Sequence, residues 1–262
     1  MMTRRTFLHS AAALGAIGPA WADSATVLPP DVGRKFLANG QVRQFKGNTI
    51  ICHLPQQGDQ AQPFSGLISI YEQVPARAFS RKITLTPPSS YHMTIFGGAN
   101  DQDRKPGLWP ADMPFDTPIE TCNRILADRL RTAPFDYALP IRMKLDTTPP
   151  SAVESPLTIH LVPDDAAEEE KLRSLRDRIS ERLKIRQPGH EQYRFHITLA
   201  YLVDWLSAEE HDDFLEFLSD WRDKLASLAP TIVLGAPEYC VFDDMFAFHR
   251  QFFLPARRAE AK

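Results

Sequence analysis

The feature that most constrains this chain is a short string that occurs twice, as His92-x-Thr94 and His196-x-Thr198, each inside an apolar run. Successive side chains of a β-strand point to opposite faces of the sheet, so residues two apart share one face. The apolar residues between and beside them then face a core. The matched pair, with one copy in each half of the chain, predicts two strands that place two imidazoles and two hydroxyls around one site.

The order of elements around the two strings also repeats. Each half of the chain contains short strand-like runs, a His-x-Thr strand, a helix with a capping sequence at its start and a further strand. Strands mixed with a few helices are typical of the α+β class rather than of a regularly alternating α/β sheet. We therefore predict an α+β fold of two pseudo-symmetric lobes, each a mostly antiparallel sheet with outer helices, around a central cleft.

Composition along the chain sets the predicted boundaries. Residues 1–22 have the pattern of a signal peptide, and residues 23–41 form a loose lead-in that Pro and Gly punctuate. The first lobe is predicted over 42–148 and the second over 157–262. Residues 149–156 are rich in Pro and lack periodicity, so they are the predicted linker.

Local patterns give further expectations. The apolar run Leu67–Tyr71 predicts a strand, and Gly97-Gly98 predicts the end of the first His-x-Thr strand. Thr117 precedes a Pro and lies three residues before a Glu, which predicts a helix start with Thr117 as its N-cap. A second capping box predicts another helix start at Ser207.

The N-terminus carries the features of an export signal. Arg4-Arg5 is followed by a stretch of small apolar residues, and Ala20-Trp21-Ala22 is a small-x-small cleavage site. The apolar stretch is far shorter than the ~20 residues that span a bilayer. The segment resembles a twin-arginine (Tat) signal peptide. We expect the Tat machinery to export the folded precursor, with cleavage after Ala22, a periplasmic product and no membrane anchor.

Charge and cysteine content narrow the ligands to be expected. The chain has 30 basic and 33 acidic side chains, a formal net charge of −3, and no basic stripe of the kind that binds long nucleic acid. Cys52, Cys122 and Cys240 form no Cys-x-x-Cys or Cys/His cluster, which disfavours a zinc site. Buried free thiols are the simpler expectation, although one disulfide stays open. No metal or cofactor is predicted.

Two facing histidines suit the hydrolysis of a phosphodiester. The attacking water must lose a proton on one side of phosphorus, and the leaving oxygen must gain one on the other. An imidazole, with an ordinary pKa of ~6.5, can serve either role. We assign His92 and His196 as the catalytic pair, without saying which is base and which is acid. The hydroxyls of Thr94 and Thr198 are expected to bind the non-bridging oxygens.

The alternation rule adds three weaker candidates. Arg194 and Ser90 each precede a motif histidine by two residues, so both are expected on its face. Arg194 is either a phosphate clamp or a surface ion pair, and Ser90 either donates a hydrogen bond to phosphate or serves its own loop. Phe96 should share the face of His92 and Thr94, where it could stack on a base.

The two strings, their order and their separation of about 100 residues resemble the paired signature of the 2H phosphoesterase superfamily. That group includes cyclic phosphodiesterases, RNA 2′-5′ ligase-like proteins and a small-nuclear-RNA-trimming exonuclease. The longer string from Tyr91 to Thr117 is most similar to an uncharacterised bacterial and fungal branch. The resemblance implies two pseudo-symmetric lobes with the four motif residues lining a central cleft.

Resemblance and composition together predict a metal-independent phosphodiesterase that hydrolyses a 2′,3′-cyclic nucleotide or a similar small cyclic phosphodiester. Two alternatives stay open at this point. One is an RNA-end processing enzyme, either a 3′ exonuclease or a 2′-5′ ligase. The other is a non-catalytic protein that binds a phosphate ligand. The physiological substrate, the ring oxygen that leaves and the oligomeric state are not fixed by the sequence.

Overall fold

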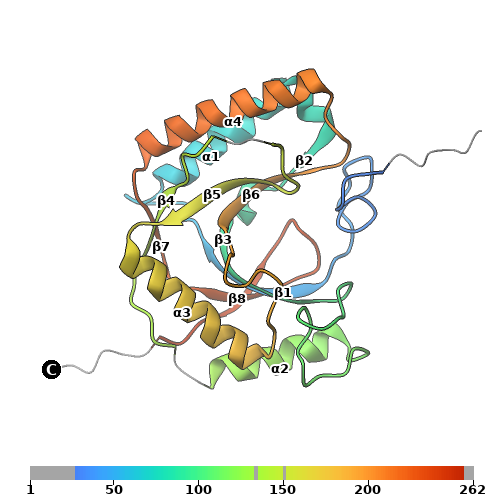
Figure 1. Cartoon of the computed structure of the whole chain (residues 1–262), viewed down its shortest axis with the longest axis vertical. Helices are drawn as coiled ribbons and strands as arrows, with labels where there is room; N and C mark the ends of the chain where they lie inside the picture. Colours follow the sequence, from blue (N-terminus) through green and yellow to red (C-terminus); the bar gives the residue numbers. More distant parts are fainter. Residues whose placement is uncertain (1–26, 133–134, 150–151, 257–262) are drawn as a thin grey trace, which may run out of the picture.

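The strands of this chain form one curled sheet with the helices on its outer side (Figure 1). The computed structural model describes residues 27–132, 135–149 and 152–256. The predicted signal peptide lies outside these residues. Within the described part, no helix combines the length and the apolar character that crossing a membrane requires.

All strand pairs are antiparallel, and the order across the sheet is β7-β4-β5-β6-β3-β1-β8-β9, with β2 also paired to β6. The strands are Gly47–His53 (β1), Ile83–Leu85 (β2), His92–Asn100 (β3), Ile141–Leu145 (β4), Leu157–Pro163 (β5), Phe195–Leu202 (β6), Ile232–Leu234 (β7), Glu238–Phe242 (β8) and His249–Phe253 (β9). The helices are Gln62–Gln73 (α1), Ile119–Arg131 (α2), Ala166–Leu183 (α3) and Ala208–Leu228 (α4). The α+β class is therefore confirmed.

The centre of the sheet has an approximate two-fold arrangement. The two His-x-Thr strands, β3 and β6, pair antiparallel with Met93 opposite Ile197. Strand β1 then pairs with the other edge of β3, and β5 pairs with the other edge of β6. Helices α1 and α4 pack together over one part of the sheet, and α2 and α3 pack together over the other (Figure 1). The pseudo-symmetric lobes predicted from the repeat are present in this arrangement.

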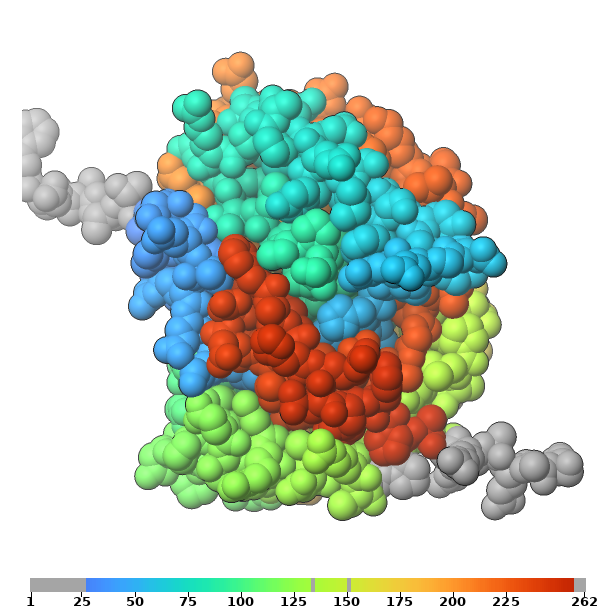
Figure 2. All heavy atoms as spheres, turned by 180° about the vertical axis from the view of Figure 1, so that it is seen from behind, coloured from blue at the N-terminus to red at the C-terminus, as the bar shows by residue number. Residues whose placement is uncertain are grey.

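The two halves of the chain exchange strands within the sheet. Strand β4 pairs with β5 and β7, whereas β8 and β9, from the end of the chain, lie beside β1. Figure 2 shows these C-terminal residues, in red, lying across one face of the molecule beside the first described residues, in blue. Strands from both halves of the chain lie side by side in one sheet. The predicted lobe boundaries at 42–148 and 157–262 describe the repeat in the sequence and stay a prediction.

Residues Leu67–Tyr71 lie in α1, so the strand predicted there is wrong. Their buried positions, Leu67 and Ile70, recur at helical spacing and face the core. The helix crosses α4 at Gly66, where a Cβ atom would come within 2.2 Å of the Leu225 side chain. Close packing between two helices therefore decides the structure of this apolar run.

The predicted helix starts have mixed outcomes. Ser207 accepts the backbone N–H hydrogen bond expected of the N-cap of α4. Helix α3 begins in the same way, with Asp165 as the side chain that accepts the hydrogen bond. Thr117 is not an N-cap, because Pro118 holds that position in α2 without any side-chain cap bond. The carbonyl of Thr117 instead accepts a hydrogen bond from Arg104.

The structure differs from the predicted end of the first His-x-Thr strand and from the predicted loose lead-in. Strand β3 does not end at Gly97-Gly98 but continues to Asn100. A Cβ atom at Gly98 would overlap the Asn48 side chain. The Oδ1 atom of Asn48 accepts a hydrogen bond from the backbone N–H of Ala99. The lead-in is folded rather than loose over residues 27–41, because Phe36 is fully buried and packs against Tyr201 with ring centroids 4.8 Å apart.

Candidate active site

The pairing of β3 with β6 brings the two His-x-Thr strings together. Because Met93 lies opposite Ile197, the antiparallel register sets His92 near Thr198 and Thr94 near His196. The four motif side chains line one cavity of about 390 Å³. This volume lies in the range of sites that hold small molecules. The structure thus assembles, in one place, the four residues that the motifs single out.

Both motif imidazoles are held by a backbone carbonyl two residues earlier in the chain. The Nδ1 atom of His92 lies 2.6 Å from the carbonyl oxygen of Ser90, and that of His196 lies 2.8 Å from the carbonyl oxygen of Arg194. A carbonyl oxygen only accepts, so each Nδ1 carries the hydrogen. In the neutral ring, the Nε2 atom is then left with a lone pair and can act as a base.

Burial disfavours a proton on both motif histidines. Desolvation lowers the pKa of His92 to about 3, and the neighbouring His53 and His196 act in the same direction. Desolvation is also the main cause of the lowered pKa of His196, and His160 adds to it. Both rings are therefore neutral in the unliganded cavity at pH 7. An anion such as a phosphodiester would favour a protonated imidazole beside it.

The side chain of Arg194 lies outside this cavity. Its guanidinium is more than half exposed and pairs with Glu154 at 3.3 Å and with Asp146 at 3.8 Å. The residue precedes the first residue of β6, so the alternation rule does not apply to it. The phosphate clamp is therefore a wrong prediction for Arg194, and the surface ion pair describes it.

The role of Ser90 in the structure is local. Its hydroxyl donates a hydrogen bond of 2.7 Å to the carbonyl oxygen of Pro87, while its own carbonyl holds the ring of His92. The residue lines the cavity but its hydroxyl is already used. The loop hydrogen bond, the second alternative for Ser90, is the one observed.

Phe96 does not face the cavity, so the predicted stacking position is wrong. The pairing of β1 with β3 shifts between Thr94 and Phe96, which leaves an extra residue in β3. Such a bulge resets the alternation of faces. Phe96 is fully buried, with the Arg176 guanidinium 5.6 Å and the His190 ring 5.9 Å from its ring centroid.

Other aromatic residues line the cavity, most of them from segments outside the two His-x-Thr strands. Phe248, in the loop between β8 and β9, has its ring centroid 4.4 Å from that of His92 and 5.3 Å from that of Phe242. Phe45 and Tyr201 line the same cavity. Phe248 is only partly buried, so part of its ring remains accessible beside a motif histidine. No local pattern marks this loop residue, because the pairing of β1 with β8 is what brings it to the site.

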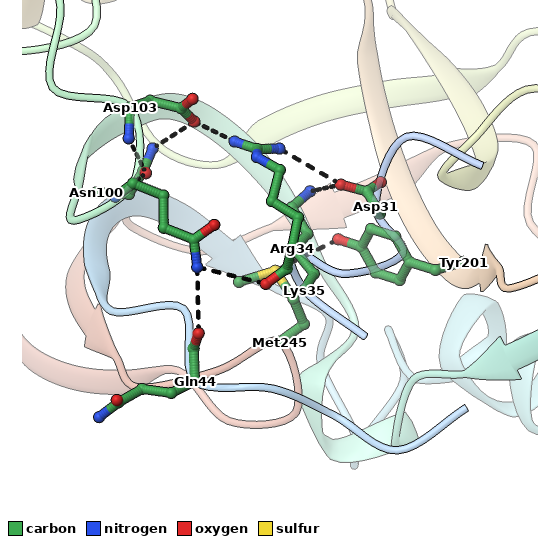
Figure 3. A network of polar contacts seen from close by, with 9 residues as sticks. Asp31, Arg34, Lys35, Gln44, Asn100, Asp103, Tyr201 and Met245 are labelled. Atoms are coloured by element: carbon green, nitrogen blue, oxygen red, sulfur yellow. Dashed lines mark hydrogen bonds and ion pairs between the residues drawn. The ribbon is translucent and has the colours of Figure 1, made fainter. Parts of the chain in front are cut away.

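A charged network joins the folded lead-in to the cavity (Figure 3). Asp31, which is 4% exposed, contacts Lys35 at 3.1 Å and Arg34 at 3.5 Å, and Arg34 also pairs with Asp103. The Lys35 ammonium lies 4.8 Å from the ring centroid of Tyr201. Burial lowers the pKa of Lys35. Because each cation faces a carboxylate, the network adds little net positive charge to the cavity.

The remaining candidate ligands are dispersed. Among the residues that the structure describes, no group of three or more His, Cys, Asp and Glu side chains is placed to hold a metal ion. Cys52, Cys122 and Cys240 are buried free thiols, as the simpler expectation had it. The predicted lack of a metal requirement stays a prediction.

The fold and the paired His-x-Thr strands define a two-histidine phosphoesterase architecture. A family model described as "2H-phosphodiest: Domain of unknown function (DUF1868)" matches residues 35–154. The crystal structure of the conserved protein of unknown function ATU0111 from Agrobacterium tumefaciens str. C58 is 30% identical, with a TM-score of 0.78. That match covers 86% of this chain and 93% of the other. The chain belongs to the 2H phosphodiesterase family.

A second solved structure, TT0787 of Thermus thermophilus, is 15% identical and covers 80% of this chain and 99% of its own. Its TM-score of 0.41 is too low to carry an argument about this fold. No curated protein matches the chain.

The neutral state of the desolvated His92 ring should be measurable as acid sensitivity. Its pKa of about 3 in the folded chain lies below the ~6.5 of an unfolded chain, so the unfolded state binds the proton first as pH falls. Stability is therefore lost from about pH 6.5 downward. We expect His92→Gln to reduce the dependence of the unfolding free energy on pH between 6 and 4, by at most about 1.4 kcal/mol per pH unit.

Urea unfolding at a series of pH values measures this effect. His211→Gln is the matched control, because His211 lies on α4 outside the cavity and should leave the slope unchanged. Equal slopes for wild type and His92→Gln would contradict the burial of a neutral imidazole at this position.

Proposed function

We propose that this chain hydrolyses a 2′,3′-cyclic nucleotide or a similar small cyclic phosphodiester, by metal-independent acid–base catalysis with two histidines. The observation that carries the proposal is the single cavity lined by His92, Thr94, His196 and Thr198 from two paired strands. Membership of the 2H phosphodiesterase family supports phosphoesterase activity in general.

The arrangement suits in-line displacement at phosphorus. A phosphodiester between the strings would accept hydrogen bonds from the hydroxyls of Thr94 and Thr198, with one imidazole on either side. The neutral imidazole takes a proton from the attacking water as the new P–O bond forms. The other imidazole, protonated, gives its proton to the ring oxygen as the old P–O bond breaks. The product is a phosphomonoester, and exchange with solvent restores the two protonation states.

The two backbone carbonyls contribute to this chemistry. By holding a hydrogen on Nδ1 of both rings, Ser90 and Arg194 leave Nε2 as the atom that accepts or donates the catalytic proton. An imidazolium formed in turnover keeps the same bond to the carbonyl. The carbonyls therefore support both the base and the acid form of each ring.

The aromatic wall of the cavity beside His92 favours a small substrate with an uncharged, flat group. Phe248, Phe242, Phe45 and Tyr201 supply aromatic surface there. The cations of the network in Figure 3 are each bonded to a carboxylate, so they offer little to a second phosphate. A cavity of about 390 Å³ is also small for an oligonucleotide. These features favour a cyclic mononucleotide over an RNA end.

Turnover of 2′,3′-cyclic nucleotides in the presence of EDTA tests the chemistry. We expect His92→Ala and His196→Ala each to lower kcat by a factor of about 10²–10⁴, because each removes one proton transfer. His211→Ala serves as the control and should retain wild-type turnover. Wild-type activity in both motif variants would refute their assigned roles.

The same assay separates the two alternatives. No turnover of any cyclic or linear phosphodiester would refute the proposed function, and tight binding without turnover would favour a binding protein. Binding to short RNA that weakens steeply with added salt would favour the RNA-end enzyme, because phosphate contacts release counterions.

Phe248 gives the proposed base-binding part of the cavity its own test. Loss of stacking on one base costs about 1–3 kcal/mol, so Phe248→Ala should raise KM for a cyclic nucleotide by a factor of about 5–150. The effect on kcat should be smaller. Phe253→Ala is the matched control, since Phe253 is about half exposed on β9, outside the cavity. An unchanged KM in Phe248→Ala would contradict stacking.

We also propose that a Tat signal directs the precursor to the periplasm. The twin arginines and the cleavage site after Ala22 support this, and both lie outside the described residues. Changing Arg4 and Arg5 together to Lys should trap the uncleaved precursor in the cytoplasm, as fractionation and the mass of the product would show. Unchanged fractionation of the double variant would reject the export proposal.

A further inference from the structure

Each motif histidine has a second histidine beside it on the neighbouring outer strand. His53 on β1 lies opposite His92 on β3, and His160 on β5 lies opposite His196 on β6. The ring centroids are 6.0 Å apart with an interplanar angle of 69° in the first pair, and 6.1 Å apart at 70° in the second. The approximate two-fold arrangement of β3 and β6 therefore extends to a second pair of imidazoles.

Each outer histidine is bound to a glutamate. The Nδ1 atom of His53 lies 3.1 Å from a carboxylate oxygen of Glu238, and the Nε2 atom of His160 lies 2.9 Å from one of Glu154. These two His–Glu pairs are called the outer dyads below. A carboxylate that bonds one ring nitrogen fixes the orientation of the imidazole. The same two-part unit thus stands beside each motif histidine.

We propose that His53 and His160, each held in place by its glutamate, are positioning residues that keep the neighbouring motif histidine neutral until an anionic substrate enters. The mechanism does not otherwise use His53 and His160. Their part in catalysis rests on the proposed function, but their effect on the motif rings is a property of the unliganded protein.

Electrostatics gives the direction of the effect. A proton on an outer histidine places positive charge about 6 Å from the motif ring and disfavours a second proton there. His53 and His160 accordingly act on the pKa values of His92 and His196 in the same direction as burial, whereas Glu154 raises the pKa of His196. A phosphodiester anion opposes this repulsion. Its arrival then allows one motif ring to take up the proton that an acid catalyst needs.

Other charged or titratable groups face these rings from the packed elements. Around the first dyad they are His196 on β6, Glu238 on β8 and Arg250 on β9. Around the second dyad they come from the segments before β5 and β6 and from α4, and they are Asp146, Glu154, Tyr193, Arg194 and Arg222. Glu238 and Glu154 are the carboxylates that bond to the outer imidazoles. Removing an outer histidine alone therefore isolates its effect from those of the other groups.

The two dyads differ in exposure. The Glu238 side chain is 7% exposed, whereas that of Glu154 is 53% exposed. Charge interactions are screened less when the groups are buried. We therefore expect the first dyad to affect its motif histidine more strongly than the second.

Titration of the histidine rings by NMR, with ¹⁵N-labelled histidine and without substrate, tests the proposal. At 6 Å, a unit charge shifts a pKa by about 0.5–2 units for effective dielectric constants between those of water and a protein surface. His53→Gln should raise the pKa of His92 by this amount and leave His196 unchanged. His160→Gln should raise the pKa of His196, by less, and leave His92 unchanged.

The titration is repeated over pH 4–9 with inorganic phosphate. A bound phosphate anion should raise the pKa values of the motif rings toward neutral pH, where the folded protein can be titrated. His211→Gln is the control and should move neither ring, while circular dichroism confirms that each variant is folded. Glu238→Gln should have a smaller effect on His92 when His53 is already Gln, if the carboxylate acts through that ring.

The outcomes separate this inference from the proposed function. The role of the dyads would be overturned if His92 and His196 had the same pKa values in both variants as in wild type, with and without phosphate. This holds whatever the enzyme activity. Shifts of both motif rings in each variant would also overturn it, because they would indicate a general loosening. Selective shifts in a protein without turnover would support the dyads and refute only the catalytic proposal.

Discussion

The register between β3 and β6 is the constraint on which the site depends. Met93 and Ile197 face each other across this pair and are 0% and 1% exposed. A slip of one residue in either strand would turn its histidine and threonine into the core and its apolar residues toward the cavity. Burial of one such side chain is worth about 1.5–3 kcal/mol, so the core itself holds the motif residues in place. Stability and site geometry are set by the same strands.

The sequence predicts the parts of the site that depend on regular strands. The period of two places His92 and Thr94 on one face because β3 is regular there. The rule fails for Phe96, since a bulge against β1 resets the alternation, and for Arg194, since β6 begins only at the next residue. A bulge depends on how another strand pairs, so a single stretch of sequence does not reveal it.

Contacts between distant parts of the chain explain the other differences. An apolar run of five residues, such as Leu67–Tyr71, suits a strand or a buried helix, and packing against α4 selects the helix. Pro and Gly in the lead-in indicate turns, but Phe36 finds its partner Tyr201 far along the chain. Phe248 likewise reaches His92 only through the pairing of β1 with β8.

The exchange of strands has a consequence for the synthesis of this protein. Strand β1 pairs with β3 on one edge, but the partner for its other edge, β8, begins only at Glu238. A nascent chain on the ribosome therefore carries an unpaired strand edge until β8 has emerged. Exposed edges of this kind recruit other chains and promote aggregation. Folding to the native state then requires β8 to have been synthesised, and a chaperone that shields this edge would raise the yield.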